Sequence, residues 1–319
     1  MSINIIAEFC QNHNGDVKVL ARMIEEAKIN GASHAKLQGL YSSELTKRSE
    51  FERGNQTDGS LLRPYQIEFD RLSKLDLTPD VESKFVQDCI KANIVPMITV
   101  FTHAGLDRAV NAGFKSFKIA SYDCGSRELI SRILPYADEL VISTGATLWH
   151  EIELTSELVA ASKKPETKIA FLHARTIYPT PLENMNISRM MYLKYLGWET
   201  GLSDHSRPEI DGLIASKLAI HLGASYIERH FTVLDRDETR DGPVSINPQH
   251  LLELFDFSNR NPRERYLELS KIVDLASISF GTSQLEIDPQ EVINSKYYRG
   301  RVASWHGSEQ VYSWQPWEN

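Results

Sequence analysis

Two lysines, Lys36 and Lys118, stand inside short apolar stretches of the sequence, where cationic side chains are unusual. A buried ammonium group is costly unless an anion pairs with it. One explanation is an internal ion pair with Glu8 or Glu228. Another is that the two lysines together hold the phosphate or carboxylate of a substrate. A Schiff base between a lysine and a carbonyl substrate is a third role that the residues leave open.

Small hydroxyl side chains end several of the same apolar stretches, which favours the substrate-binding interpretation. They are Thr99, Ser121, Ser143 and Ser203. Lysine ammonium groups and neutral hydroxyls together donate the hydrogen bonds that an oxyanion accepts. The pattern therefore predicts a binding site for a phosphate or a carboxylate.

Two histidines, His205 and His230, stand at the ends of the last two apolar stretches. Imidazole is a common ligand of transition-metal dications. Carboxylates lie close by in the sequence at Asp204, Glu228 and Asp241. We therefore expect a site for Mn²⁺, Fe²⁺ or Zn²⁺ with open coordination positions. The alternative is that each histidine simply makes a hydrogen bond in the core.

All of these residues occupy the same place in a repeated unit, in which a β-rich apolar stretch ends in polar residues and an amphipathic helical stretch follows. The apolar stretches are Ile3–Phe9, His34–Gly39, Val95–Val100, Ser116–Ser121, Leu140–Gly145, Lys168–Ala174, Glu199–Asp204 and Tyr226–Phe231. Strands that alternate with helices pair in parallel and are buried on both faces. The repeat predicts an α/β fold, a (β/α)8 TIM barrel, whose strand ends meet at one mouth.

The helical stretches between the strands support this fold. They are Val17–Asn30, Pro79–Asn93, Gly105–Ala112, Leu148–Ser162 and Glu209–Leu222. Gly31, Gly113 and Gly223 follow three of them and suit left-handed helix C-caps. An open doubly wound sheet is the competing fold, but its first turn usually carries G-x-G-x-x-G. The residues after Glu8 lack that spacing, which favours the barrel.

Two stretches fall outside the repeat. Leu40–Thr78 is a long connection after the second strand, and connections of this length are often functional covers. We assign residues 1–275 to the barrel and residues 276–319 to a C-terminal tail with aromatic residues over Tyr312–Trp317. We expect the tail to pack against the barrel or against a partner subunit.

The composition argues against several classes of protein. The chain has 319 residues, with 35 lysines and arginines against 43 aspartates and glutamates, a formal net charge of −8. Nucleic-acid binding normally needs a basic face, so we expect no such partner. No apolar stretch is long enough to span a membrane, and we see no signal peptide. Three scattered cysteines fit a reduced, cytoplasmic setting, and we assign no reactive role to Cys10 or Cys124.

At these same positions the sequence resembles the sialic acid synthase family, which comprises N-acetylneuraminate synthases and their pseudaminate and legionaminate relatives. The matching segments occur in family order, and they are Ile6–Glu8 with Asn12–Gly15, Ala35–Gln38, Phe117–Ser121, Ile142–Gly145, Leu172–His173 with Tyr178–Glu183, Gly201–His205 and Ile227–Thr232. Tyr-Pro-Thr-Pro followed by Ser-Asp-His and Glu-Arg-His-Phe is highly specific in combination.

The resemblance implies a TIM-barrel transferase that condenses phosphoenolpyruvate with an open-chain 2-acetamido sugar, such as N-acetylmannosamine or a 6-deoxy diacetamido hexose. The products are a nonulosonic acid and phosphate, and the lysines would hold charge without forming a Schiff base. A divalent metal is implied, Mn²⁺ first with Mg²⁺ or Co²⁺ as alternatives, to polarise the aldehyde. A homodimer is the family expectation.

The resemblance also implies roles for individual residues. The phosphoenolpyruvate-binding residues would be Lys36, Thr99, Lys118, Ser121, Ser143, Thr176 and Ser203. The metal ligands would be His205 and His230. The catalytic residues would be Glu8, Asp123, Tyr178, Asp204 and Glu228. Carboxylates such as that of Glu8 could stabilise an oxocarbenium at C2 of phosphoenolpyruvate. The residues on the sugar side would be Gln38, Tyr178 and Asp241.

The sequence departs from the family pattern at a few positions. Thr176 takes the place of an asparagine, Asp123 stands where glutamate is common, and Asp241 would supply an acid that relatives carry in Pro-Gly-Pro-Asp. Relatives usually continue into a small antifreeze-like domain that reaches the partner's active site, whereas here a short tail follows Tyr298–Ala303. We therefore expect Leu40–Thr78 or the tail to complete the sugar side.

Two other functions remain open from the sequence. One is a phosphoenolpyruvate-dependent synthase that makes another ulosonic acid from a different aldose. The other is a catalytically degenerate barrel that binds a sugar without turnover, which Thr176 and the expected absence of the domain would favour.

Overall fold

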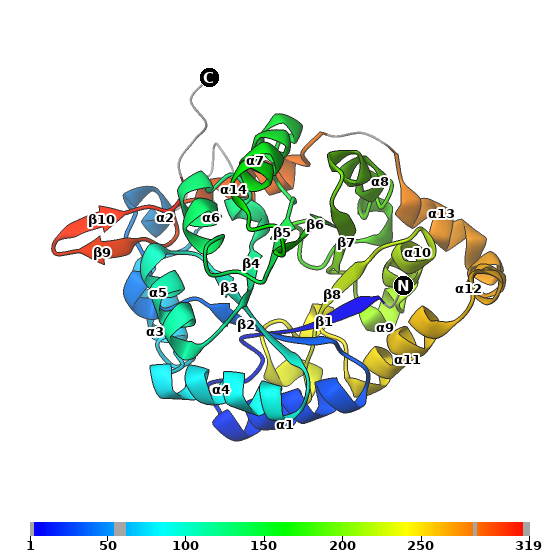
Figure 1. Cartoon of the computed structure of the whole chain (residues 1–319), viewed down its shortest axis with the longest axis horizontal. Coiled ribbons are helices and arrows are strands. Elements are labelled where there is room, and N and C mark those ends of the chain that lie inside the picture. Colours follow the sequence, from blue (N-terminus) through cyan, green and yellow to red (C-terminus); the bar gives the residue numbers. More distant parts are fainter. Residues whose placement is uncertain (1–2, 54–61, 283–285, 315–319) are drawn as a thin grey trace.

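Eight parallel strands close on themselves at the centre of the molecule (Figure 1). The computed structural model describes residues 3–53, 62–282 and 286–314. The strands are β1 (Asn4–Cys10), β2 (His34–Gly39), β3 (Val95–Val100), β4 (Ser116–Ile119), β5 (Glu139–Ser143), β6 (Lys168–Ala174), β7 (Glu199–Asp204) and β8 (Tyr226–His230). Each strand pairs with the next, and β8 pairs with β1. The predicted (β/α)8 barrel is confirmed.

Helices surround the strands in a ring (Figure 1). They are α1 (Val17–Ile29), α4 (Pro79–Lys91), α5 (His103–Ala112), α6 (Arg127–Ile133), α7 (Trp149–Ser162), α8 (Arg189–Leu193), α10 (Ile214–His221) and α11 (Pro248–Asn259). The largest apolar cluster fills the space between the two layers and includes Phe9, Phe85 and Phe114. A smaller cluster inside the barrel contains Ile6, Met97 and Leu172. It closes the barrel interior, so no pore runs through it.

The predicted element boundaries differ from the observed ones by a few residues at most, except at one helix. The stretch Glu209–Leu222 forms two helices, α9 (Pro208–Asp211) and α10. Gly212 separates them with a φ of +57°, which no right-handed helix accommodates. The predicted C-cap glycines are confirmed, since Gly31 and Gly113 have φ angles of +93° and +98°.

The connection Leu40–Thr78 is more structured than the sequence suggested. It contains a 3₁₀ turn η1 (Ser42–Glu44), α2 (Ser49–Arg53) and α3 (Tyr65–Leu72), and its residues 54–61 lie outside the described part of the chain. Leu40, Leu45 and Leu72 form a small apolar cluster together with Val302 from the C-terminal tail. The connection therefore forms a small packed unit beside the barrel.

After α11 the chain continues through α12 (Pro262–Leu269) and α13 (Val273–Phe280) into the C-terminal tail, which contains α14 (Pro289–Tyr298) and a hairpin of β9 (Ser304–His306) and β10 (Glu309–Val311). The tail binds to the connection after β2. Leu45 and Val302 form an antiparallel bridge, and Thr46 N donates to the Arg301 carbonyl at 3.0 Å. Arg48 donates to carbonyls at the end of α14, which satisfies C-terminal acceptors of that helix.

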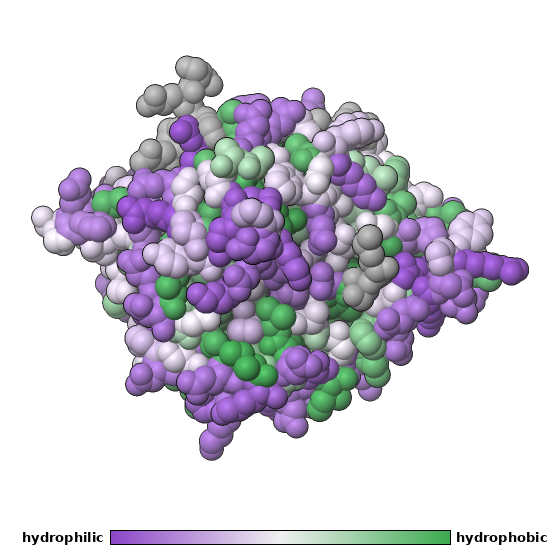
Figure 2. All heavy atoms as spheres, viewed as in Figure 1, coloured by the Kyte–Doolittle hydropathy of each residue, from purple (hydrophilic) through white to green (hydrophobic). Residues whose placement is uncertain are grey.

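The hairpin β9–β10 projects from the molecule beside α5 (Figure 1). The face shown in Figure 2 is mostly hydrophilic, with scattered apolar side chains. Among the described residues, no helix has both the length and the apolar character needed to cross a bilayer.

Candidate active site

The register of the barrel strands places the predicted site residues next to one another. The pairs in register are Glu8–Lys36, Glu8–His230, Gln38–Thr99, Thr99–Lys118 and Ser203–Glu228. They line a cavity of about 370 Å³ at the carboxyl ends of the strands. The predicted residues that line it are Glu8, Lys36, Gln38, Thr99, Lys118, Ser121, Ser143, Tyr178, Ser203, His205, Glu228, His230 and Asp241.

Lys36 is held by carboxylates and a hydroxyl on the cavity floor. Its Nζ contacts the carboxylate of Glu8, donates to Thr99 Oγ1 at 2.7 Å and lies 3.7 Å from Glu228 Oε2. Burial, together with the nearby charge of Lys118, lowers the pKa of Lys36. The internal lysine–glutamate ion pair that the sequence suggested is therefore present. It does not exclude anion binding, because Lys36 also lines the cavity.

Lys118 and Glu228 form the second half of the floor. Lys118 Nζ donates to Ser143 Oγ at 2.6 Å and lies 3.7 Å from Glu228 Oε1. Ser203 Oγ donates to the same carboxylate at 2.7 Å. Burial opposes ionisation of Glu228, but Lys118 and Lys36 outweigh it and lower its pKa to about 2. Glu228 is therefore an anion at neutral pH.

The two histidines lie beside each other in the same cavity, with ring centroids 5.5 Å apart. His205 Nδ1 donates to the Arg175 carbonyl at 2.9 Å, which leaves a lone pair on Nε2. Burial and the charge of His230 lower the pKa of His205 to about 3. Burial also lowers the pKa of His230. Neutral imidazoles with free lone pairs are what a dication requires.

Tyr178 covers the histidines. Its ring centroid lies 4.2 Å from that of His205 and 6.2 Å from that of His230. It follows β6, and the peptide bond between Tyr178 and Pro179 is cis. Its ring forms one wall of the cavity, and 53% of the residue remains exposed. The phenol therefore lies where a substrate would pass.

Arginines gather at the mouth of the cavity. Arg63 and Arg71 come from the connection after β2, Arg240 follows β8, and Arg301 comes from the tail. Three of them converge on one carboxylate, as the Glu68 Oε1 atom lies 2.5 Å from Arg71, 3.3 Å from Arg240 and 3.1 Å from Arg301. This arginine cluster, defined as Arg63, Arg71, Arg240 and Arg301, makes the mouth cationic. The connection after β2 and the tail, either of which was expected to complete the sugar side, thus both supply residues to this cavity.

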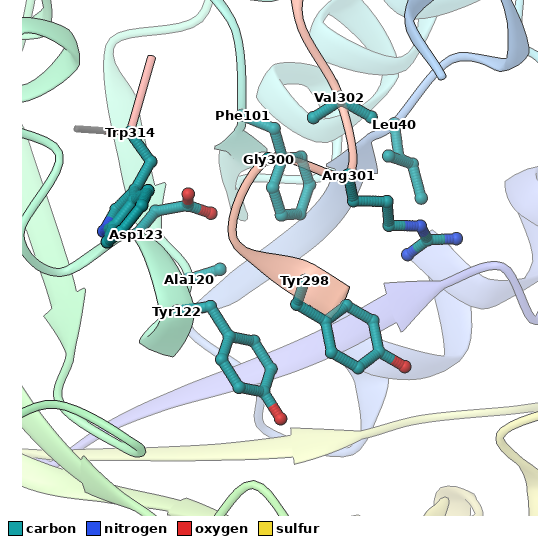
Figure 3. Close-up of a pocket in the computed structure, with 10 residues that line it drawn as sticks. All are labelled: Leu40, Phe101, Ala120, Tyr122, Asp123, Tyr298, Gly300, Arg301, Val302 and Trp314. Carbon is teal, nitrogen blue, oxygen red and sulfur yellow. The ribbon is translucent and has the colours of Figure 1, made fainter. Parts of the chain in front are cut away.

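The tyrosines Tyr122 and Tyr298 stack with ring centroids 4.7 Å apart and form a wall that also borders a smaller cavity. Figure 3 shows Asp123 beside Trp314 in that second cavity. Burial raises the pKa of Asp123 to about 7. Asp123, predicted to be catalytic, thus lines the smaller cavity and is absent from the main cavity's lining.

Asp204, also predicted to be catalytic, lies outside the cavity. It is fully buried and pairs with Arg229 at 2.5 Å, and Arg229 is itself fully buried. Its carboxylate also accepts hydrogen bonds from Ser206 and Ser216. The prediction misplaced this side chain because Asp204 follows Ser203 directly, and successive strand residues face opposite sides of the sheet.

Thr176, predicted to bind phosphoenolpyruvate, makes hydrogen bonds to the tail instead. Its N–H and its hydroxyl both donate to Oε1 of Glu291, at 2.8 Å and 3.1 Å. Glu291 belongs to α14, is fully buried and also pairs with Arg175 at 3.0 Å. Thr176 therefore anchors the tail helix to the loop after β6 and does not line the main cavity.

Sequence reasoning missed several residues of the cavity wall. They are Cys10, Gln11, Arg63, Phe101, Arg71, Tyr122, Arg240, Tyr298 and Arg301. The length of the connection after β2 was a signal for the arginines within it. Tyr298 and Arg301 reach the cavity through the fold of the tail, for which no local pattern exists.

Comparison with known proteins gives consistent matches. A model described as the NeuB family matches residues 23–263. An N,N'-diacetyllegionaminic acid synthase of Campylobacter jejuni subsp. jejuni serotype O:2 is 30% identical over 256 residues, which cover 77% of this chain and 72% of that protein. A pseudaminic acid synthase of serotype O:23/36 of the same subspecies is 26% identical over 302 residues, covering 94% and 81%.

A similar solved structure is that of the N-acetylneuraminic acid synthetase of Leptospira borgpetersenii serovar Hardjo-bovis, in complex with citrate. It matches with a TM-score of 0.68 and 26% identity, over 93% of this chain and 91% of that chain. The similarity therefore extends beyond the barrel strands to most of the chain.

Proposed function

The chain belongs to the NeuB family of sialic acid synthase-type enzymes, and from this premise we propose that it condenses phosphoenolpyruvate with an open-chain 2-acetamido sugar and water. The products would be a nonulosonic acid and inorganic phosphate. N-acetylmannosamine and a 6-deoxy diacetamido hexose are the acceptors we favour. The observation that carries the proposal is that Lys36, Lys118 and two neutral histidines line the same cavity.

The floor of the cavity fits the anionic substrate. Phosphoenolpyruvate carries a phosphate and a carboxylate, and Lys36 and Lys118 offer ammonium groups beside the hydroxyls of Thr99 and Ser143. Charge-assisted hydrogen bonds of this kind are the strong ones. Glu228 already balances part of this positive charge. When phosphoenolpyruvate binds, the lysines would therefore exchange contacts with carboxylates of the floor for contacts with the substrate.

The proposed reaction forms one carbon–carbon bond and breaks one carbon–oxygen bond. C3 of phosphoenolpyruvate attacks the aldehyde carbon of the sugar, and positive charge develops at C2. Glu8 and Glu228 lie on the floor where their carboxylates can stabilise that charge. Water then adds at C2, and the C2–O bond breaks so that phosphate leaves with the bridging oxygen.

The histidines of the cavity fit a divalent cation, for which we propose Mn²⁺ with Mg²⁺ or Co²⁺ as alternatives. His205 and His230 would hold it, since both are neutral and His205 keeps Nε2 free of a strong hydrogen bond. A bound dication would supply Lewis acidity toward the sugar aldehyde. Tyr178, whose ring packs against His205, would form the wall of the site beside this cation.

The test is a panel of aldoses incubated with phosphoenolpyruvate and the purified chain, with and without Mn²⁺, and read by phosphate release and product mass spectrometry. We expect phosphate release that requires both an amino-sugar aldose and the metal, and loss of turnover in His205→Ala and His230→Ala. Label in the bridging oxygen should appear in phosphate.

Other outcomes would contradict the proposal. Turnover with a different aldose alone would point to another ulosonic acid. Sugar binding without phosphate release from phosphoenolpyruvate, whichever aldose is added, would indicate a barrel that binds a sugar without turnover. Bridging oxygen retained in the sugar product would exclude the proposed C–O cleavage.

A further inference from the structure

Cys10 ends β1 at the wall of the main cavity, beside His230 and Asp241. A potential ligand atom from each of these three residues lies within 4.8 Å of the other two. Cys10 is 5% exposed, so its side chain is almost completely shielded from solvent. Thiol, imidazole and carboxylate are the three side-chain types that bind transition metals most often.

The backbone directs the thiol toward this cluster. The pairing of β1 with β2 shifts register between Glu8 and Cys10, and Cys10 has a φ of +45°. Its N–H donates to Glu8 Oε1 at 2.6 Å. Glycine adopts this left-handed conformation freely, whereas a residue with a Cβ does so at a cost. The local structure therefore holds a cysteine where glycine would be the less strained choice.

A second observation points to a ligand at the same place. His230 Nδ1 is buried and makes no hydrogen bond to any residue that the structure describes. Asp241 Oδ2 lies 3.7 Å from this nitrogen, too far for a hydrogen bond. Buried polar nitrogens are normally satisfied. A cation shared by the imidazole and the carboxylate would satisfy both.

We propose that Cys10, together with His230 and Asp241, is a ligand of the divalent metal in this cavity, and that its thiolate shifts the site toward Zn²⁺, Co²⁺ or Fe²⁺. This inference rests on the metal binding of the proposed function. His205 lies across from His230 and can complete the set. Thiolates favour softer metals, whereas oxygen-rich sites suit Mn²⁺ and Mg²⁺. Cys10, to which the sequence assigned no role, then becomes a determinant of metal choice.

Spectroscopy of the cobalt-loaded chain without substrates tests the proposal. The purified full chain is stripped with a chelator and titrated with Co²⁺. We expect a near-ultraviolet thiolate-to-cobalt charge-transfer band in the wild type and in the control Cys89→Ala, whose thiol is buried away from the cavity. The band should be absent from Cys10→Ser. Calorimetry should show Zn²⁺ affinity falling by at least about 10-fold in Cys10→Ser, with a smaller change for Mn²⁺.

A third variant separates folding from binding. Cys10→Gly suits the left-handed backbone and should unfold no more easily than the wild type, yet it should lack the band. Identical cobalt spectra and Zn²⁺ affinities in the wild type and both Cys10 variants would overturn the proposal. Because no phosphoenolpyruvate or sugar is present, that result would leave the proposed condensation to its own assay.

Discussion

The floor of the main cavity carries lysines and carboxylates in near balance, so its affinity for an anion depends on which of them hold protons. Glu8 and Glu228 contact Lys36, and Glu228 also lies near Lys118. Burial lowers the pKa of both lysines. A lysine in this position loses its proton at a pH where an exposed lysine remains fully charged.

The KM for phosphoenolpyruvate should therefore depend on pH. Since the pKa of Lys36 is lowered, its positive charge disappears as pH rises through that lowered value, and the KM for phosphoenolpyruvate should rise there.

Lys118→Ala should raise this KM by about 10- to 100-fold, the effect of losing a hydrogen bond to a charged group. Steady-state kinetics from pH 6 to 10 would measure both effects. Lys84→Ala on the exposed face of α4 is the control. A pH-independent KM would contradict the cationic role of the floor.

Asp204 illustrates a charged residue whose effect should be on stability. It pairs with Arg229 in a fully buried contact. Burial opposes its ionisation, but Arg229 and the neighbouring hydroxyls outweigh it and lower its pKa. Asp204→Ala should lower the free energy of unfolding by about 3–5 kcal/mol, because it leaves Arg229 buried without its partner. Urea unfolding monitored by circular dichroism would measure the loss.

The same residue predicts a pH effect. A carboxyl group whose folded pKa is lowered stabilises the fold above its unfolded pKa, near 3.8, and this contribution is lost as pH falls toward the folded value. Asp204→Ala should therefore flatten the acid limb of stability against pH. A variant that folds with wild-type stability but has lost all turnover would instead support the catalytic role that the sequence suggested.

At the scale of elements, a buried carboxylate helps to fix α14 against the loop after β6. Glu291 accepts from Thr176 and pairs with Arg175, both in the loop after β6. The same helix ends at Tyr298, which forms part of the cavity wall. This contact therefore couples the position of the tail to the shape of the site.

Glu291→Ala should remove the nearer of the two carboxylates that pair with Arg175, leaving Asp288 at 3.4 Å. It should destabilise the chain by about 1–3 kcal/mol, the cost of leaving buried donors of Arg175 and Thr176 without their acceptor. It should also raise the KM for the sugar more than the KM for phosphoenolpyruvate, because Tyr298 would lose its support whereas Lys36 and Lys118 would not. Unfolding and kinetic measurements on the same preparations would check this. Gln290→Ala, an exposed change in the same helix, is the matched control. Equal KM changes for both substrates would contradict the coupling.

The sequence predicted the positions of the strands better than the directions and contacts of individual side chains, for physical reasons. Apolar stretches with polar ends located every barrel strand, because buried parallel strands must be apolar and their ends must face the mouth. Side-chain direction was harder. Alternation along β7 excludes Asp204 from the cavity, whereas the register shift before Cys10 breaks simple alternation in β1. Contacts such as Thr176 with Glu291 join residues far apart in sequence, and no local pattern encodes them.

At the scale of the whole molecule, the charge at the cavity mouth is opposite in sign to the net charge of the chain. The chain has a net charge of −8, yet the arginine cluster makes the mouth of the cavity cationic. Low-dielectric walls focus such a field and raise the local concentration of anionic substrates. The segments that supply these arginines are separate in sequence and are joined by the contacts of Thr46 with Arg301 and of Arg48 with the end of α14.

Arg301 provides the sharpest test of this arrangement. It comes from the tail, lies at the cavity mouth and shares Glu68 with Arg71 and Arg240. Arg301→Gln keeps a hydrogen-bond donor but removes the charge. We expect the KM for the acceptor sugar to rise about 10-fold, the effect of losing a charge-assisted hydrogen bond, with a smaller change for phosphoenolpyruvate, whose proposed contacts lie on the floor.

Added salt should reduce the difference between Arg301→Gln and the wild type if the effect is long-range attraction at the open mouth, because dissolved ions screen charges that act through solvent. Kinetics at low and high ionic strength measure this. Arg263→Gln on the exposed side of α12 is the control for a general loss of positive charge. If Arg301→Gln and Arg263→Gln behave alike, the tail contributes structure to the mouth and no recognition of the sugar. If the sugar KM alone rises, and salt diminishes that rise, the tail completes the sugar side of the site within a single chain.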